Sequence, residues 1–256
     1  SNPESVLNGE IVWFPKEITF QGYERVFQNK DIVTGYMNTI LYTVAGTAVN
    51  IVMTVIAAYP LSRHDFKGRN VIMALFVFTM FFGGGLIPTY LLIKQLGMLN
   101  TFWVMIIPGA VAVWNIIIMR TFFQQSIPNE VQEAALIDGC SNIQILIRII
   151  LPLSVPILAV MVLFYSVDHW NAYFGAMIYL SDRDKFPLQL ILREILVQSQ
   201  MEKMMENSQD SFARIVMSSE SIKYAVIIIA NLPIFMLYPF LQKYFVKGIM
   251  IGAIKG

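Results

Sequence analysis

The residues best suited to act on another molecule form one string in the middle of the chain. Two uncharged hydrophobic runs flank this string, so we expect it to be a loop pressed against a membrane surface. It offers carboxylates, which can pair with basic groups, and small side chains, which permit close approach to another protein. Its informative positions are Glu133, Ala134, Ala135, Asp138, Gly139, Ile149, Leu151 and Pro152.

The string predicts two short helices joined at a glycine. Pro128 suits the first turn of helix one, and either Ser126 or Asn129 can cap that turn. Gly139 can adopt the left-handed conformation that ends this helix. Ser141 and Gln144, three residues apart, form a capping box for helix two.

Composition restricts the chain to a membrane protein. Apolar residues make up 56% of it and charged residues 14%, against about 25% charged in soluble domains. Mean hydropathy is +0.61, and a net charge of +1 argues against a nucleic acid partner. The single Cys140 excludes an internal disulfide and a cysteine metal site, and His64 and His169 are isolated, so no metal site is expected.

The predicted fold is all-α, with five transmembrane helices in this chain. Each corresponds to an uncharged stretch that can cross about 30 Å of hydrocarbon, the first of them from about Met37. The stretches are Ile32–Ser62, Val71–Ile93, Gln95–Met119, Ile149–Val167 and Tyr224–Gln242. Gly83-Gly84-Gly85 should break the second stretch, either as a bent helix lining a pathway or as a packing kink, and Pro156 should bend the fourth.

Basic residues predict the orientation of these helices. Lys and Arg crowd the first connection, flank residues 121–150 and follow the last stretch, which marks those segments as cytoplasmic. Residues 1–31 and 171–223 are then external, which puts the N-terminus of this chain outside and its C-terminus in the cytoplasm. Because residues 1–30 contain no signal-peptide core, we expect a sixth, upstream helix in the intact protein.

Two aromatic–amide pairs are the candidates for contact with a solute. Trp170 and Asn171 end the fourth stretch, where a tryptophan can serve as an interfacial anchor or stack on a sugar ring. Trp114 and Asn115 lie deeper, in the third stretch. Beyond the fourth stretch, residues 186–200 predict an amphipathic helix on the outer surface, which is either packed on the chain or part of a docking platform.

The spacing Glu-Ala-Ala, three residues, Gly, nine residues, Ile, one residue, Leu-Pro resembles the coupling loop of bacterial ABC importer permeases. Other stretches resemble the maltose-type branch, which takes up carbohydrates. They are Ile87-Pro88-Thr89-Tyr90, Leu99-Asn100-Thr101, Trp170-Asn171 and the end of the chain from Gln242 to Gly256. Residues 169–193 most resemble the subset that moves complex glycans or oligosaccharides from polysaccharides.

The resemblance implies a permease domain over residues 32–247 and a cytoplasmic tail over 248–256 in the bacterial inner membrane. The implied partners are a second, homologous permease, two ATP-binding cassette ATPase subunits, an extracytoplasmic sugar-binding protein and a carbohydrate. At the end of the chain, four residues would contact the ATPase: Lys247, Gly248, Gly252 and Lys255. The alternative is that the lysines there only anchor the chain on the cytoplasmic side. The chain contains no Walker A loop, so it should carry no cofactor, and ATP and magnesium should be bound by the partner ATPase.

In the implied mechanism, Val131, Ala134 and Ala135 form a slim apolar face that enters a cleft of the ATPase, where Glu133 pairs with a basic group. Helix two would then move the fourth span, through Ile143, Leu146, Ile147 and Ile150. The runner-up solute is a peptide or a phosphate ester. A secondary transporter would need charges within its spans, which the five stretches lack. An intramembrane enzyme would need paired acids or a nucleophile with its base at membrane depth, and the five stretches show no such set.

Overall fold

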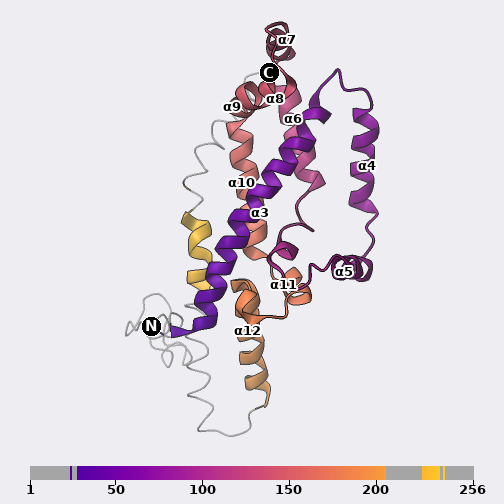
Figure 1. Ribbon diagram of the computed structural model, residues 1–256. Helices are drawn as coiled ribbons and strands as arrows, with labels where there is room; N and C mark the ends of the chain where they lie inside the picture. Colours follow the sequence, from indigo (N-terminus) through magenta and orange to yellow (C-terminus); the bar gives the residue numbers. More distant parts are fainter. Residues whose placement is uncertain (1–23, 25–27, 206–226, 237–238, 240–256) are drawn as a thin grey trace. The chain divides into compact units, whose positions relative to one another are not determined.

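The computed structural model describes residues 28–205 and 227–236, together with Glu24 and Pro239, and in this part of the chain every regular element is a helix (Figure 1). The all-α prediction is therefore confirmed for these residues. The α-helices are α3 (Lys30–Ser62), α4 (Arg69–Phe81), α5 (Leu86–Gln95), α6 (Val113–Ser126), α7 (Asn129–Ile137), α8 (Asn142–Ile145), α9 (Leu151–Leu153), α10 (Val155–Asn171), α11 (Phe174–Tyr179), α12 (Leu188–Met205) and an apolar helix at Ile227–Met236.

Shorter turns connect some of these helices. Phe102–Met105 and Arg183–Lys185 are single 3-10 turns, and Leu146–Ile150 is a π-helical turn between α8 and α9. The described residues form two compact units, one from residues 42–169 and the other from residues 28–41, 170–205 and 227–236. Helices α3 and α10 each contribute residues to both units.

One described helix, α3, is long and apolar enough to cross a membrane alone, with 33 residues. It ends at Ser62, as the first predicted stretch does, and starts two residues before Ile32. Two bent pairs meet the same criterion jointly, α4 with α5 and the run α8–α9 with α10. The prediction of five spans stays a prediction, because the fifth falls partly outside the described residues.

The second predicted span is broken at its glycines, as expected. Helix α4 ends at Phe81 and α5 starts at Leu86, with an angle of 109° between them. Gly85 has a φ of +84°, a value that L-residues with a side chain rarely adopt, so the chain can turn there.

The third predicted span, Gln95–Met119, is not one continuous helix, and this prediction was wrong. The chain leaves α5 at Gln95, and α6 begins only at Val113 and continues to Ser126. Gly97 has a φ of +67°, which ends α5, and Pro108 and Gly109 disfavour a helix before α6. An uncharged run is thus compatible with an apolar loop between two helices.

The fourth predicted span bends where prolines surround Ser154. Helices α9 and α10 meet at this residue, and the run α8–α9 makes an angle of 82° with α10. Pro156 lies at the second position of α10, where its missing N–H removes the hydrogen bond that would continue the helix from Pro152. The bend predicted at Pro156 is confirmed within two residues.

The unit of residues 42–169 joins α3 to α10 through buried polar contacts. The Thr54 hydroxyl lies 2.6 Å from that of Tyr165, and Asn50 Oδ1 lies 2.7 Å from Nε2 of His169. Asn50 Nδ2 also donates to the Gly109 carbonyl at 2.6 Å. Because a lipid environment offers no hydrophobic drive for helix association, such contacts fix which faces of α3 and α10 meet.

In the other unit, α12 packs on the first turns of α3. Leu188 and Ile191 are each 1% exposed and pack against Ile32. The Thr39 hydroxyl accepts a hydrogen bond of 2.8 Å from the Leu188 N–H, which satisfies one of the free donors at the start of α12. The predicted amphipathic helix is therefore confirmed, and its apolar face is partly covered by the chain itself.

Candidate functional site

The string singled out in the sequence folds as two helices joined at Gly139, which we call the coupling segment (residues 129–153). Gly139 has a φ of +78°. Its N–H donates to the Leu136 carbonyl, and the Cys140 N–H donates to the Ala135 carbonyl, each at 3.0 Å. These paired bonds are a Schellman motif, which ends α7 at Ile137. The predicted glycine termination is confirmed.

The second helix starts with the predicted capping box. Ser141 Oγ accepts from the Gln144 N–H at 3.4 Å, and Gln144 Oε1 accepts from the Ser141 N–H at 2.8 Å. The prediction for the start of α7 was wrong, because the N-cap is Pro128 and no side chain caps it. Ser126 belongs to α6 and Asn129 is already inside α7, so neither occupies the capping position.

The coupling segment is seated in the core of its own unit through three side chains. Ile145 and Ile150 are fully buried and Ala135 is 5% exposed, all in one cluster with Phe123 and Tyr165. Ala135 thus packs inward rather than on the slim outer face predicted for it. Its small size allows α7 to lie close to the underlying helices.

Polar contacts fix the same segment to the end of α3. Arg63 Nη1 lies 3.1 Å from the Tyr59 hydroxyl and 3.4 Å from Gln132 Oε1 on α7. Arg63 also makes two hydrogen bonds to Asp65, at 2.7 and 2.8 Å, which raise the pKa of the guanidinium and lower the pKa of the Asp65 carboxyl. Arg63 therefore stays charged across the physiological range and holds α7 beside α3.

Helix α6 supplies the remaining contacts at this end of the unit. Arg120 Nε donates to the Leu61 carbonyl at 2.9 Å, and Gln124 Nε2 donates to the Ser62 carbonyl at 3.3 Å. These donors satisfy carbonyls that the end of α3 leaves free, and the positive charge suits the negative end of the helix dipole. These two hydrogen bonds therefore join α6 to the end of α3, the end at which Arg63 contacts α7.

The outer surface of the segment combines acids with large apolar side chains. Glu133, Ala134, Asp138 and Gly139 are exposed. Leu136 is 44% exposed and Ile137 is 87% exposed. The apolar side chain of Ile137 is thus exposed to solvent beside two carboxylates. Such a combination of exposed apolar and charged groups is typical of a surface that another protein covers.

In the second helix, the predicted apolar face is divided. Ile150 is buried and Leu146 is half-buried against the core, whereas Ile143 and Ile147 are 69% and 58% exposed. Toward the end of the segment, Ile149 and Leu151 are half-buried and Pro152 is exposed. The π-helical turn over 146–150 shifts the register here, so that Ile145 rather than Ile143 turns inward.

A first prediction concerns the bend at Gly139. A Cβ at this position would have no atom within 4 Å, so a substitution acts through the backbone alone. Gly139→Val should lower the free energy of unfolding by about 1–2 kcal/mol, because a β-branched residue disfavours a left-handed φ. Gly139→Asn, the matched control, should stay closer to the wild type, since Asn tolerates this conformation. Thermal unfolding in detergent measures both, and equal stability of the two variants would contradict the argument.

The four predicted solute contacts have different environments. Trp114 is 62% exposed, while its neighbour Asn115 is buried at 8%. Trp170 is 5% exposed, donates from Nε1 to the Ala230 carbonyl at 2.8 Å and meets Tyr36 edge to face. Trp170 is thus occupied as a packing anchor between helices, and its ring is not open for stacking on a sugar. Asn171, in contrast, is exposed.

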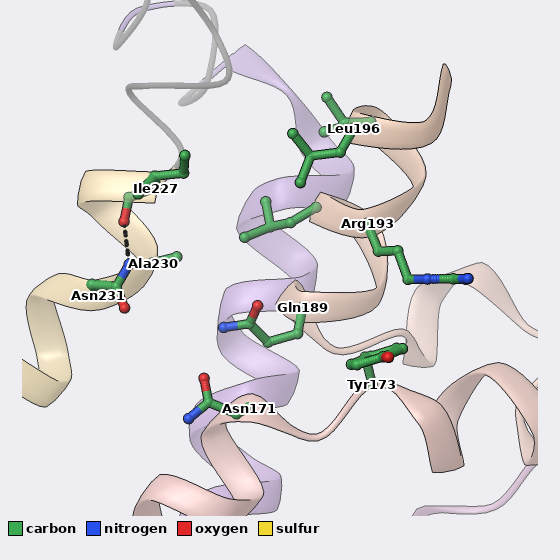
Figure 2. Close-up of a pocket in the computed structure, with 10 residues that line it drawn as sticks. Asn171, Tyr173, Gln189, Arg193, Leu196, Ile227, Ala230 and Asn231 are labelled. Atoms are coloured by element: carbon green, nitrogen blue, oxygen red, sulfur yellow. Dashed lines mark hydrogen bonds between the residues drawn. The ribbon is translucent and has the colours of Figure 1, made fainter. Parts of the chain in front are cut away.

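Asn171 lines a pocket of about 410 Å³ in the unit that contains α12 and the helix at 227–236 (Figure 2). Sequence reasoning missed the other polar side chains of this pocket: Tyr173, Gln189, Arg193 and Asn231. They belong to three segments, residues 171–173, α12 and the helix at 227–236, and no local spacing shows that these three segments line one pocket. The predicted tail contacts, Lys247, Gly248, Gly252 and Lys255, lie outside the described residues.

Comparison with known proteins identifies the family. Residues 32–251 match the family described as the inner membrane component of binding-protein-dependent transport systems. The chain is 45% identical to the protein LplC of Bacillus subtilis over 95% of this chain and 81% of LplC. It is 40% identical to the polygalacturonan/rhamnogalacturonan transport system permease protein YtcP of the same organism, over 99% of this chain and 87% of YtcP.

A solved structure agrees with these relatives. A chain of a bacterial ABC transporter involved in the import of the acidic polysaccharide alginate is 36% identical, with a TM-score of 0.85. The match covers 96% of this chain and 86% of that one. The family is one of pore-forming subunits in the bacterial inner membrane, in which partner subunits hydrolyse ATP. The chain therefore belongs to the binding-protein-dependent transport system inner membrane components, the permease subunits of ABC importers.

Proposed function

We propose that this permease carries an oligosaccharide into the cell by alternating access, and that residues 129–153 couple this movement to separate ATPase subunits. The observation that carries the proposal is the doubly capped coupling segment, which presents Glu133 and Ile137 outward while Ala135 and Ile150 hold it on the membrane helices. A segment that is packed on the membrane helices on one side and exposed on the other can transmit movement between two subunits.

In the proposed mechanism, α7 lies in a groove of the ATPase. Glu133 pairs with a basic group at the groove wall, and Leu136 and Ile137 are covered by apolar surface. When the ATPase subunits close on ATP, the groove carries α7 along. The run α8–α9 continues to Ser154, where the chain turns by 82° into α10. Movement of the coupling segment then tilts α10, and the pathway opens outward.

The proposed assembly contains a second permease, two ATPase subunits that bind ATP and magnesium, and an extracytoplasmic sugar-binding protein. In the proposed orientation, the coupling segment and the C-terminus are cytoplasmic, while residues 1–31 and 171–223 are external. Residues 248–256 would form a tail on the ATPase pair, with Lys247, Gly248, Gly252 and Lys255 as contacts. Membership of a binding-protein-dependent family supports this assembly.

The proposed substrate class is an oligosaccharide derived from a complex glycan. It is supported by YtcP, named for polygalacturonan and rhamnogalacturonan, and by the structural relative that imports alginate. A third relative, at 26% identity over 99% of this chain, is the arabinooligosaccharide permease AraQ of Halalkalibacterium halodurans. Peptides and phosphate esters remain the competing solutes for the experiment.

The test is solute uptake by the complete complex in proteoliposomes. The vesicles would hold ATP, and each solute would be added outside with its binding protein. We expect ATP-dependent accumulation of oligosaccharides and none of dipeptides or glycerol phosphate. Accumulation of a dipeptide or a phosphate ester in place of sugars would contradict the substrate class and leave the coupling mechanism intact.

A further inference from the structure

The pocket beside α12 has the composition of a saccharide site. Three side-chain amides line it, and they come from three elements: Asn171 at the end of α10, Gln189 on α12 and Asn231 on the helix at 227–236. Figure 2 shows Gln189 and Asn171 reaching toward the helix that carries Asn231. An amide carries both donors and an acceptor, which matches the hydroxyl groups of a sugar, and one donor of Asn231 is used by the Ile227 carbonyl at 2.7 Å.

The rest of the lining suits the apolar faces and edges of sugar rings. Tyr173 is 41% exposed, and Leu192, Ile195, Leu196 and Ile227 complete the wall. The volume of about 410 Å³ lies within the range of roughly 300–1,000 Å³ that small-molecule sites occupy. The pocket therefore combines an apolar floor with a few convergent polar groups.

An arginine at the rim of the pocket favours a ligand that carries a negative charge. The guanidinium of Arg193 lies 5.5 Å from the centre of the Tyr173 ring, and Nη1 lies 2.9 Å from the Met177 sulfur. Within the described residues, no carboxylate forms an ion pair with Arg193, whereas the nearby Arg183 pairs with both Asp31 and Glu194. Figure 2 shows the Arg193 side chain extended from α12 above the Tyr173 ring.

We propose that this pocket is a subsite for an acidic oligosaccharide, in which Asn171, Gln189 and Asn231 bind hydroxyl groups and Arg193 binds the carboxylate of a uronate residue. The inference rests on the proposed function, since it places a subsite on the external side of the pathway. A guanidinium and a carboxylate form paired, charge-assisted hydrogen bonds, which distinguish a uronate from the neutral sugar of the same shape. Two relatives whose names specify acidic polysaccharides are consistent with this preference.

The experiment compares two matched sugars, trigalacturonate and galactotriose, in uptake by the complete complex in proteoliposomes. Arg193→Gln should raise the KM for trigalacturonate about tenfold and leave the KM for galactotriose unchanged, while Arg193→Lys should retain part of the preference. Asn231→Leu and Gln189→Leu should raise the KM for both sugars several-fold, because the lost hydrogen bonds serve hydroxyl groups that both sugars carry. In all variants the maximal rate should stay near that of the wild type.

Lys94→Gln, which removes an exposed charge from α5, is the control and should change neither KM. Wild-type KM values in Arg193→Gln, Asn231→Leu and Gln189→Leu alike would overturn the subsite. An equal effect of Arg193→Gln on both sugars, or on the maximal rate alone, would show a structural role and would also overturn it. A wild-type complex that transports neither sugar while hydrolysing ATP would overturn the proposed substrate class, and the subsite with it.

Discussion

Glu133→Lys should lower ATP-driven uptake at least tenfold while leaving the amount of permease in the membrane unchanged. Glu133 is exposed on α7 and makes no contact that seats the coupling segment, which rests instead on Ala135, Ile145 and Ile150. The substitution therefore leaves the fold intact. It brings a cation close to a groove wall that should itself carry a basic group. A like-charge pair at such an interface costs several kcal/mol, and each 1.4 kcal/mol is about a tenfold change in binding.

The matched control for this prediction is Glu130→Lys. Glu130 is also exposed on α7, but it lies in the first turn, one turn before Glu133 on the same face of the helix. We expect the control to keep most of the uptake. Copurification of the ATPase subunits, measured beside uptake, separates weak binding from lost force transmission. Equal uptake by the wild type and Glu133→Lys would contradict the proposed role of this carboxylate.

Gly46→Ala should lower the free energy of unfolding by about 1–3 kcal/mol, the usual cost of overpacking a buried contact. A Cβ at Gly46 would collide with the imidazole of His169, so that ring would have to move. His169 Nε2 lies 2.7 Å from Asn50 Oδ1, and this hydrogen bond between α10 and α3 would be lost if the ring moved. Because α10 is the helix proposed to move with the coupling segment, the loss should appear in transport as well as in stability.

Two further variants make this prediction specific. Gly175→Ala, where a Cβ would meet only ordinary contacts at 3.9 Å, should be neutral or slightly stabilising. The double variant Gly46→Ala/His169→Ala should recover part of the lost stability, because it removes the ring that the new methyl group strikes. Thermal unfolding in detergent compares all of them. A Gly46→Ala protein as stable as the wild type would rule out the close packing of α3 on α10.

Local chemistry accounts for what the sequence predicted well. Gly139 and the pair Ser141 and Gln144 each satisfy backbone groups within a few residues, so their spacing alone specifies two capped helices. The break at Gly83–Gly85 has the same origin. The start of α7 was predicted wrongly because Ser126 and Asn129 are both residue types that cap helices, whereas the N-cap is Pro128 between them.

Tertiary contacts account for what the sequence could not predict. The partner of the Trp170 indole is the carbonyl of Ala230, sixty positions away, so an anchor and a sugar-stacking ring have the same local pattern. The pocket residues Gln189 and Asn231 meet only through folding of distant segments. Hydropathy could not separate a helix from an apolar loop in residues 95–119, because both lack charges.

The central claim, that the coupling segment transmits ATPase movement to the permease, is tested most directly by site-specific cross-linking in the complete complex. Cys140 is the single cysteine, so Cys140→Ser gives a background without thiols in this chain. Ile137→Cys, at a position of α7 that is 87% exposed, should cross-link to the ATPase subunit through a short bifunctional reagent, with a yield that changes when ATP is added. Asn231→Cys, in the helix that follows the external segment 171–223 in the proposed orientation, should give no such product. Cross-linking of the ATPase from position 231 and not from position 137, or a yield at 137 that ATP does not alter, would contradict the account.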